Sequence, residues 1–357
     1  MRIRMGRALA MGLGATMLAG LTALAPAVVP AMGGVAYADG PGGGTDSLPV
    51  SFDVVSTNNS GLPCATFPLG GQHFTVRGHL TGPGSELHSD RVDGTLYSHG
   101  DGYDETFWRY EKNPDYNYVE EMAHRGHVSV SIDRLGYGDS DKPNGNSACF
   151  GTEADVLHQI IGQLRRGDYH GDASPRFGRV GLVGHSASGL ISEQEAAGFH
   201  DIDALGVLDS GEASAKPLVA VRVGQEQARC LTSPDGYAPL EASDEEFASD
   251  HLYNVEPDVA RDLARNRSKD ACAGLRNSPQ AIGGNGIRNS TIKVPVLLLA
   301  GANDKFFGNL PLQAATYAQS PKVTVKVIPE TGHAVAFSRE HRKFDDEMNA
   351  WLDANHL

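Results

Sequence analysis

One short stretch, Gly184-His-Ser-Ala-Ser-Gly189, places the strictest limits on how this chain can fold. The apolar run Arg179–Val183 leads into it and a helical pattern follows at once, which predicts a strand, a very tight turn and a helix. Such a turn strains the backbone of Ser186, so the residues two positions on either side must be small. Gly184 and Ser188 meet that requirement. We predict that Ser186 is a nucleophile, although a glycine-rich turn with an idle serine fits the same six residues.

Apolar strand patterns and helix patterns alternate along the chain around this turn. Two early segments, 50–56 and 72–80, have the alternation of strands that can pair antiparallel. Further strands are predicted over 95–98, 128–133, 179–183, 204–208, 294–299 and 323–328, with helices near 104–124, 152–166, 187–197 and 310–318 and a last one ending at 352. This order predicts an α/β fold on a mostly parallel, doubly wound sheet. Reactive groups in such sheets gather at the carboxyl ends of the strands.

Residues 212–292 interrupt the alternation between the sixth and seventh strands. The segment is polar, has no sustained strand pattern, and contains short helical candidates such as 258–267. Because it leaves and re-enters the chain between two successive strands, we predict a cap over the carboxyl edge of the sheet. The core then consists of two parts, residues 50–211 and 293–357.

The first 38 residues have the organisation of a secretory signal peptide. Three arginines precede an apolar run that ends near Ala25, and Ala36-Tyr37-Ala38 is a small-x-small cleavage site. A membrane anchor is the alternative, because the apolar run approaches spanning length, but its glycines, the prolines and the cleavage site favour removal. Residues 39–49, rich in glycine and proline, are predicted to form a flexible linker. We therefore expect a secreted protein with no stable membrane anchor.

Charge and cysteine content narrow the possible partners. Loss of residues 1–38 removes three arginines and no acidic residue, which takes the formal charge from −14 to −17 and argues against nucleic acid as a partner. Four cysteines in an exported chain predict two disulfides. Of three possible pairings we favour Cys64–Cys149, which ties two core segments, and Cys230–Cys272, which staples the cap. The cysteine spacing does not fit a zinc site.

A serine hydroxyl becomes a good nucleophile when a histidine, itself oriented by a carboxylate, accepts its proton. Asp304 follows the buried strand 294–299 in a Gly-x-x-Asp turn, and His333 follows the next strand in a Gly-His turn. The order Ser186, Asp304, His333 is one of the known orders of such a triad. Asp209, at the end of the preceding strand, is a competing acid. We prefer Asp304 because it follows a longer apolar run.

Acyl transfer also needs hydrogen-bond donors directed at the oxyanion. The backbone N–H of Ala187, at the start of the helix after Ser186, is one predicted donor. The other is expected in Ser98-His-Gly-Asp-Gly102, where glycines let the backbone approach a substrate. We choose Asp101, with Gly102 as the alternative. A plain glycine turn is a further possibility.

Five segments together resemble the α/β-hydrolase superfamily over about residues 50–352. They are Tyr97–Gly102, Asp133-Arg-Leu-Gly-Tyr-Gly-Asp-Ser-Asp-Lys-Pro143, Gly184–Gly189, Gly301-Ala-Asn-Asp304 and Gly332-His333. The Asp133 segment is similar to that of epoxide hydrolases and haloalkane dehalogenases, whose nucleophile is aspartate. Serine at 186 instead implies chemistry on esters, thioesters, lactones or amides.

The resemblance implies a secreted, esterase- or lipase-like serine hydrolase that cleaves small-molecule carboxylic esters and needs no cofactor or metal. The alternatives are a lactonase and an aminopeptidase or amidase. The last would need an acidic amine-binding patch, such as Glu241, Asp244 or Glu245 facing the cleft. A non-catalytic binding protein is a third class, for which a broken triad is expected.

Overall fold

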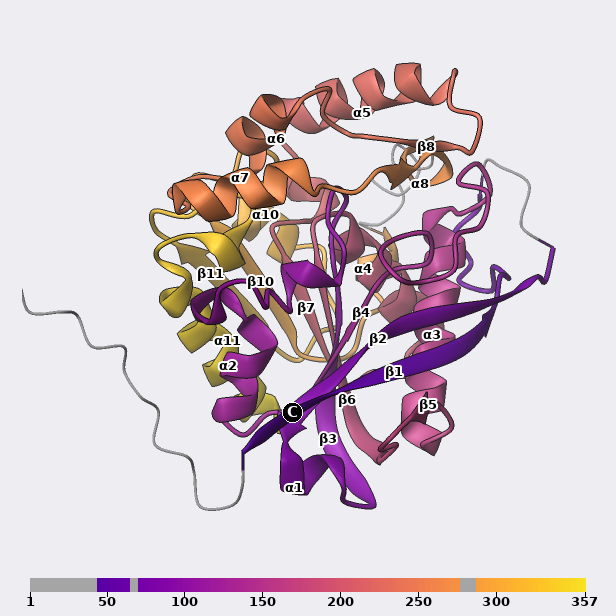
Figure 1. Ribbon diagram of the computed structural model, residues 1–357, viewed down its shortest axis with the longest axis vertical. Coiled ribbons are helices and arrows are strands. Elements are labelled where there is room, and N and C mark those ends of the chain that lie inside the picture. The colour runs from indigo at the N-terminus through magenta and orange to yellow at the C-terminus, as the bar shows by residue number, and fades with distance from the viewer. Residues whose placement is uncertain (1–43, 65–69, 277–286) are drawn as a thin grey trace, which may run out of the picture. The chain divides into compact units, whose positions relative to one another are not determined.

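One large sheet runs through the protein (Figure 1), and its central strands are continuous buried runs, such as Val296–Gly301. The computed structural model describes residues 44–64, 70–276 and 287–357. In this part of the chain the sheet has nine strands in the order β11-β10-β7-β6-β3-β4-β2-β1-β5. Their bounds are β1 Thr45–Val55, β2 His73–Pro83, β3 Arg91–Ser98, β4 Ser129–Ile132, β5 His170–Gly171, β6 Arg176–His185, β7 Ala204–Leu208, β10 Val296–Gly301 and β11 Val323–Ile328. The predicted signal peptide, residues 1–38, lies outside the described residues.

The pairing confirms the predicted fold class. β1 and β2 pair antiparallel, β2 also pairs antiparallel with β4, and the strands from β4 to β11 across the sheet are parallel. Ser98 of β3 is opposite Gly184 of β6, and Leu208 of β7 is opposite both His185 and Leu299. The loops that follow these strands therefore leave the sheet at the same edge.

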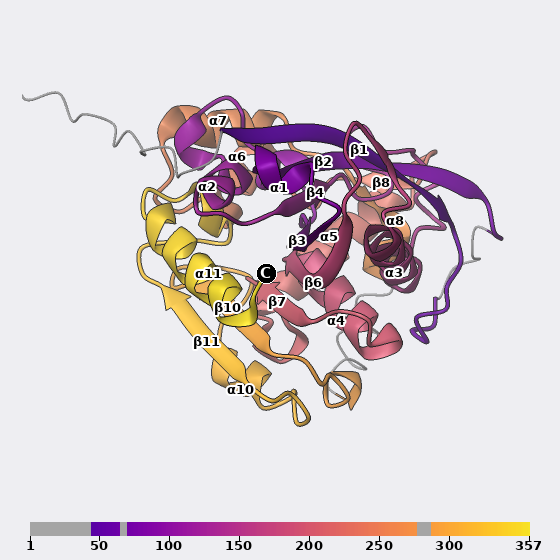
Figure 2. The ribbon, with the colours of Figure 1, turned by 90° about the horizontal axis from the view of Figure 1, so that it is seen from below.

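Helices cover both faces of the sheet (Figure 2). On one face lie α3 (Phe150–Arg166) and α4 (Ala187–Phe199), and on the other lie α2 (Tyr118–His124) and α11 (His341–Asn355). Strand residues alternate between the two cores that result. Leu298 packs with the α3 and α4 side, whereas Leu299 packs with the α2 and α11 side, and both are fully buried. The remaining short core helices are α1 (Gly84–Leu87) and α10 (Leu310–Ala314).

The chain between β7 and β10 lies over one end of the sheet, where the cap was predicted (Figure 1). Its elements are η3 Glu212–Ser214, α5 Pro217–Cys230, β8 Tyr237–Ala238, α6 Asp244–His251, α7 Pro257–Arg265, β9 Asp270–Ala271 and α8 Cys272–Arg276. β8 and β9 form a short antiparallel pair beside the disulfide Cys230–Cys272. Cys64 and Cys149 form the second disulfide, so both favoured pairings are present. Within the described ranges no helix is both long enough and apolar enough to span a bilayer.

Three predicted boundaries were wrong. Residues 45–49 are not linker, because β1 begins at Thr45 and pairs along its whole length with β2. The helix predicted over 104–124 is divided into η1 (Glu105–Phe107), η2 (Pro114–Tyr116) and α2. Pro114 explains the division, since it lacks an N–H and suits the first position of a helical turn. The helix predicted over 310–318 ends at Ala314.

Candidate active site

Ser186 lies between β6 and α4 with φ 55° and ψ −123°, a backbone conformation that side chains disfavour. The turn is tight because strand and helix pass closely. A Cβ at Gly184 would lie 2.2 Å from the carbonyl oxygen of Ser188, and one at Gly189 would lie 2.4 Å from Cβ of Ser210. Ser186 is partly exposed while its neighbours are buried, so its hydroxyl is accessible to a substrate.

Ser188, which stands where a second glycine is usual, has a contact of its own. Its side chain is fully buried, and its hydroxyl donates to the carbonyl of His99 and lies 2.9 Å from Oγ of Ser98. These contacts join the turn around Ser186 to the loop after β3, the loop in which the second oxyanion donor is predicted.

The structure brings the three predicted catalytic side chains together. Oγ of Ser186 is 2.9 Å from Nε2 of His333, and Nδ1 of His333 is 3.1 Å from Oδ2 of Asp304. His333 and Asp304 are both buried. A neutral imidazole that donates from Nδ1 to the carboxylate leaves Nε2 free to accept the serine proton.

The competing acid, Asp209, lies beside Asp304 rather than beside the serine. Carboxylate oxygens of Asp209 and Asp304 and a ring nitrogen of His333 all lie within 4.8 Å of one another. Asp209 is fully buried, and its Oδ1 accepts the backbone N–H of Gly301 at 2.8 Å. Burial, followed by the charge of Asp304, raises the pKa of Asp209 well above its usual value, whereas it is Asp304 that makes the hydrogen bond to Nδ1 of His333. Asp304 is therefore the carboxylate that faces the histidine.

The surroundings of His333 favour its neutral form. Burial lowers its pKa below the ordinary 6.5, and the nearby Asp304 only partly offsets this. His185, to which the sequence analysis gave no role, donates from Nε2 to the backbone carbonyl of His333 at 2.9 Å and stacks on Phe107. No local pattern marks His185, because its partner comes from a distant loop.

The predicted oxyanion donors lie next to Ser186 in different environments. Ala187 is the first residue of α4, where the N–H groups carry the positive end of the helix dipole. Asp101 lines the cavity at Ser186, and its carboxylate accepts from Nη1 of Arg134 at 2.8 Å, which compensates its charge. The N–H of the alternative donor, Gly102, donates to Oδ1 of Asp270 at 2.7 Å. Because the N–H of Gly102 is already bound to Asp270, Asp101 is the better candidate for the second oxyanion donor. Both donor roles stay predictions.

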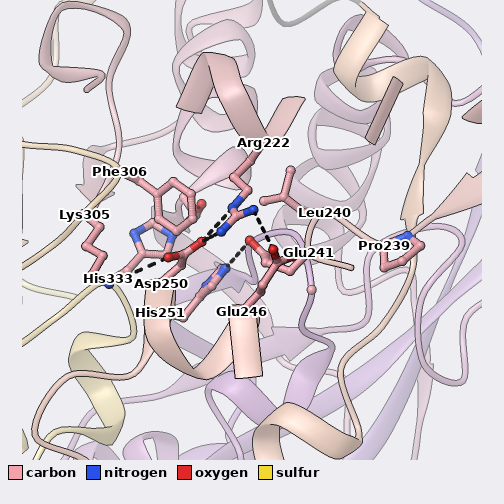
Figure 3. A network of polar contacts seen from close by, with 12 residues as sticks. Arg222, Pro239, Leu240, Glu241, Glu246, Asp250, His251, Lys305, Phe306 and His333 are labelled. Atoms are coloured by element: carbon pink, nitrogen blue, oxygen red, sulfur yellow. Dashed lines mark hydrogen bonds and ion pairs between the residues drawn. The ribbon is translucent and has the colours of Figure 1, made fainter. Parts of the chain in front are cut away.

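The cap contributes a polar network beside His333 (Figure 3). Arg222 of α5 binds Asp250 of α6 at 2.6 Å, and His251 lies between Glu241, 3.1 Å from Nε2, and the hydroxyl of Tyr103. Burial alone would raise the pKa of Glu241, but its interaction with His251 and the charge of Arg222 outweigh burial and lower it. No local sequence pattern marks His251, because its partners Glu241 and Tyr103 come from other segments of the chain.

The same network ties the cap to the loops that carry the triad. The backbone N–H of Ala334, next to His333, donates to the carbonyl of His251 at 3.0 Å. Nζ of Lys305, next to Asp304, donates to Oγ of Ser249 at 2.9 Å. The cap therefore contacts both triad loops directly.

A mostly apolar cavity of about 50 Å³ lies between Ser186 and the cap. It is lined by Asp101, Phe150, Ser186, Ala187, Leu190, Val219, Arg222, Val223, Leu240, Phe306, Phe307 and His333. None of Glu241, Asp244 and Glu245 is among these lining residues of the described chain. Glu241 pairs with His251 and Asp244 with Arg267.

Solved structures similar to this one include enzymes of differing activity. An esterase from Thermogutta terrifontis, crystallised with malate, is 18% identical, covers 82% of this chain and 98% of its own, and has a TM-score of 0.60. A monoacylglycerol lipase from Paleococcus ferrophilus is 16% identical, covers 74% of this chain and 96% of its own, and has a TM-score of 0.56. An E-2-(acetamidomethylene)succinate hydrolase is 17% identical, covers 85% of this chain and 100% of its own, and has a TM-score of 0.55. At such identities the likeness shows the fold alone.

A search of curated proteins finds no match to this sequence. The model of one protein family, described as "Alpha/beta hydrolase family", matches residues 96–346, which is more than half of the chain and includes the turn at Ser186, Asp304 and His333. The chain belongs to the alpha/beta hydrolase family.

Proposed function

We propose that this protein is a secreted serine hydrolase that cleaves carboxylic esters through a Ser186–His333–Asp304 triad and an acyl-enzyme intermediate. The observation that carries the proposal is the continuous pair of contacts from Ser186 through His333 to Asp304, at 2.9 Å and 3.1 Å. The family membership and the esterase- and lipase-like neighbours support a hydrolase of this kind.

In the first half of the reaction, Oγ of Ser186 attacks the ester carbonyl carbon while Nε2 of His333 accepts the hydroxyl proton. Asp304 stabilises the imidazolium that forms, and the backbone N–H groups of Ala187 and Asp101 bind the oxyanion. The C–O bond to the alcohol breaks as His333 returns its proton to the leaving oxygen. In the second half, a water that gives its proton to His333 attacks the acyl-enzyme, which releases the acid and restores Ser186.

The cavity restricts the substrate. It is small, about 50 Å³, and its walls beyond Ser186 are apolar, with Val219, Val223 and Leu240 coming from the cap side. We therefore propose esters with a short apolar acyl group. The acidic amine-binding patch that an aminopeptidase would need has no support, because the three acids considered for it do not line the cavity.

Labelling with a fluorophosphonate probe, together with hydrolysis of p-nitrophenyl acetate, butyrate and octanoate, tests the proposal. We expect one label on Ser186, turnover that falls from butyrate to octanoate, and loss of both in Ser186→Ala, which removes only a hydroxyl and leaves the fold intact. Only a small residual rate of ester hydrolysis, due to the oxyanion donors, is expected in Ser186→Ala. Labelling that persists in Ser186→Ala would disprove the assigned nucleophile.

Secretion has a separate test. Two disulfides suit an oxidising compartment and therefore a non-cytoplasmic protein. If the signal peptide is cleaved after Ala38, protein recovered from the culture medium begins at Asp39. An N-terminus at Met1 in cell-associated protein would contradict secretion.

A further inference from the structure

Three potential metal ligands meet at the end of α4 opposite to Ser186. They are His158 of α3, Glu195 of α4 and Asp201, which follows α4. Each offers one ligand atom, and these atoms lie within 4.8 Å of one another. Glu195 is nine residues along the chain from Ser186, which corresponds to ~13 Å along a helix axis. The cluster is thus separate from the proposed active site.

The local backbone produces this arrangement. α4 ends at Phe199, and His200 adopts the left-handed conformation with φ 57°, which turns the chain back so that Asp201 lies beside the last turn. The ring of His158 stacks on Phe199 with centroids 3.9 Å apart, and its Nδ1 is 2.6 Å from Oδ2 of Asp201. α3, α4 and the loop to β7 therefore each contribute one group.

Glu195 makes this more than an acidic patch. Its side chain is fully buried, and neither of its carboxylate oxygens has a hydrogen-bond partner among the described residues. Oδ1 of Asp201 is buried and lacks such a partner as well. Arg165, the nearby cation, binds the backbone carbonyl of Asp201 and the carboxylate of Asp203 instead. A buried carboxylate without a partner is costly, so the site requires either a cation or a shared proton.

We propose that His158, Glu195 and Asp201 form a structural site for a divalent transition-metal ion, with zinc the best fit. One imidazole and two carboxylates suit zinc, whereas calcium and magnesium prefer oxygen ligands alone. Ligand atoms on a tetrahedral ion with bonds of ~2.1 Å are ~3.4 Å apart. His158 and Asp201, now 2.6 Å apart, therefore need to separate slightly to admit the ion, and Glu195 is already within 4.8 Å of both. Water supplies the fourth ligand, since His158 and Asp201 are partly exposed.

A proton competes with zinc for these carboxyl groups. One proton shared between the neighbouring carboxyl groups of Glu195 and Asp201 would satisfy the same unpartnered oxygens without a metal. Zinc has to displace this proton. Zinc binding is therefore expected to weaken as the pH falls.

Isothermal titration of the chelator-treated protein with zinc sulfate at pH 7.5 tests the site. We expect one equivalent of zinc to bind, with an increase in Tm of about 5 °C at saturation. Cobalt at the same site should give the visible absorption of a tetrahedral ion. Glu195→Gln, whose amide can donate to Asp201, and His158→Phe, which keeps the ring beside Phe199, should each weaken binding at least about 100-fold, the upper range for loss of an outer-shell partner.

His170→Ala is the matched control. His170 also contacts an aspartate, Asp53, at 3.1 Å, but on the exposed surface and without a buried third group. The His170→Ala variant should bind zinc as the wild type does. Ester hydrolysis by Glu195→Gln, which lies outside the proposed active site, shows that this variant is folded. No zinc binding by the wild type, or equal binding by Glu195→Gln and His158→Phe, would overturn the proposal and leave the shared proton as the explanation.

Discussion

The core side and the cap side of the cavity are held in place by different interactions. On the core side, Ser186, Asp304 and His333 each follow a parallel strand, and the paired backbones of those strands fix where each loop begins. On the cap side, α5 and α6 are joined by the ion pair of Arg222 and Asp250. A disulfide near the end of α5 adds a second connection.

This difference separates chemistry from substrate selection. Strand pairing gives the core side many backbone hydrogen bonds, so a change in one side chain removes a chemical group without moving its neighbours. The cap is joined to the core by side-chain pairs and by isolated backbone hydrogen bonds, such as Ala334 to His251, rather than by a continuous strand ladder, so a single change can displace a wall of the cavity. We expect core variants to change kcat and cap variants to change KM and stability.

The largest effect is expected from the acid that faces His333. Asp304→Asn places an amide at Nδ1 and favours the wrong imidazole tautomer, for which we expect a loss of kcat of about 10⁴-fold. Asp209→Asn leaves Asp304 hydrogen-bonded to His333 and should lower kcat by less than about tenfold. Steady-state kinetics on p-nitrophenyl butyrate measures both variants. The reverse ranking would make Asp209 the triad acid.

A smaller effect is expected when the cap disulfide is removed. Replacing Cys230 and Cys272 by serine should lower the free energy of unfolding by about 2–4 kcal/mol, because the 42-residue separation is no longer closed. KM should increase more than kcat falls, as the cap wall loosens over an intact triad. Urea denaturation and steady-state kinetics provide the two measurements. A fall in kcat with an unchanged KM would contradict the separation of roles.

The pH dependence of kcat/KM reports on the core side. His333 acts as a base when neutral, and because its pKa is lowered in the folded protein, kcat/KM should stay on its plateau down to a midpoint below pH 6.5. Below the midpoint the rate should fall about tenfold per pH unit. A midpoint above 6.5 would mean that Asp304 outweighs burial.

The smallest effect concerns acid stability of the cap. The folded-state pKa of Glu241 is lowered, so its charge stabilises the fold above the ordinary value of 4.5, and this contribution is lost as the pH falls through the lower, folded value. Glu241→Gln lacks the ionisation, so its Tm should change less than that of the wild type between pH 5 and pH 3. Thermal unfolding at several pH values measures the difference. Parallel curves for both proteins would assign the acid sensitivity to other carboxyl groups.

The sequence by itself predicted the alternation of strands and helices, the turn at Ser186, the interruption between two strands that forms the cap, and the presence of two disulfides. Those features have local signals: strand and helix periodicity, small residues around one serine, a polar interruption between two strands, and an even number of cysteines. The sequence also predicted Asp304 and His333 as catalytic residues, because each follows a predicted strand in a short turn.

Tertiary structure alone decided which contacts complete the cavity and the cluster at the end of α4. The proximity of Asp209 to Asp304, the burial of Glu195 beside His158, and the contact of His251 with Glu241 near His333 join side chains from separate elements. Periodicity shows which face of an element is buried but not which residue of another element lies opposite. Charge and proton position depend on that neighbour, and so they could be assigned only after the chain was folded.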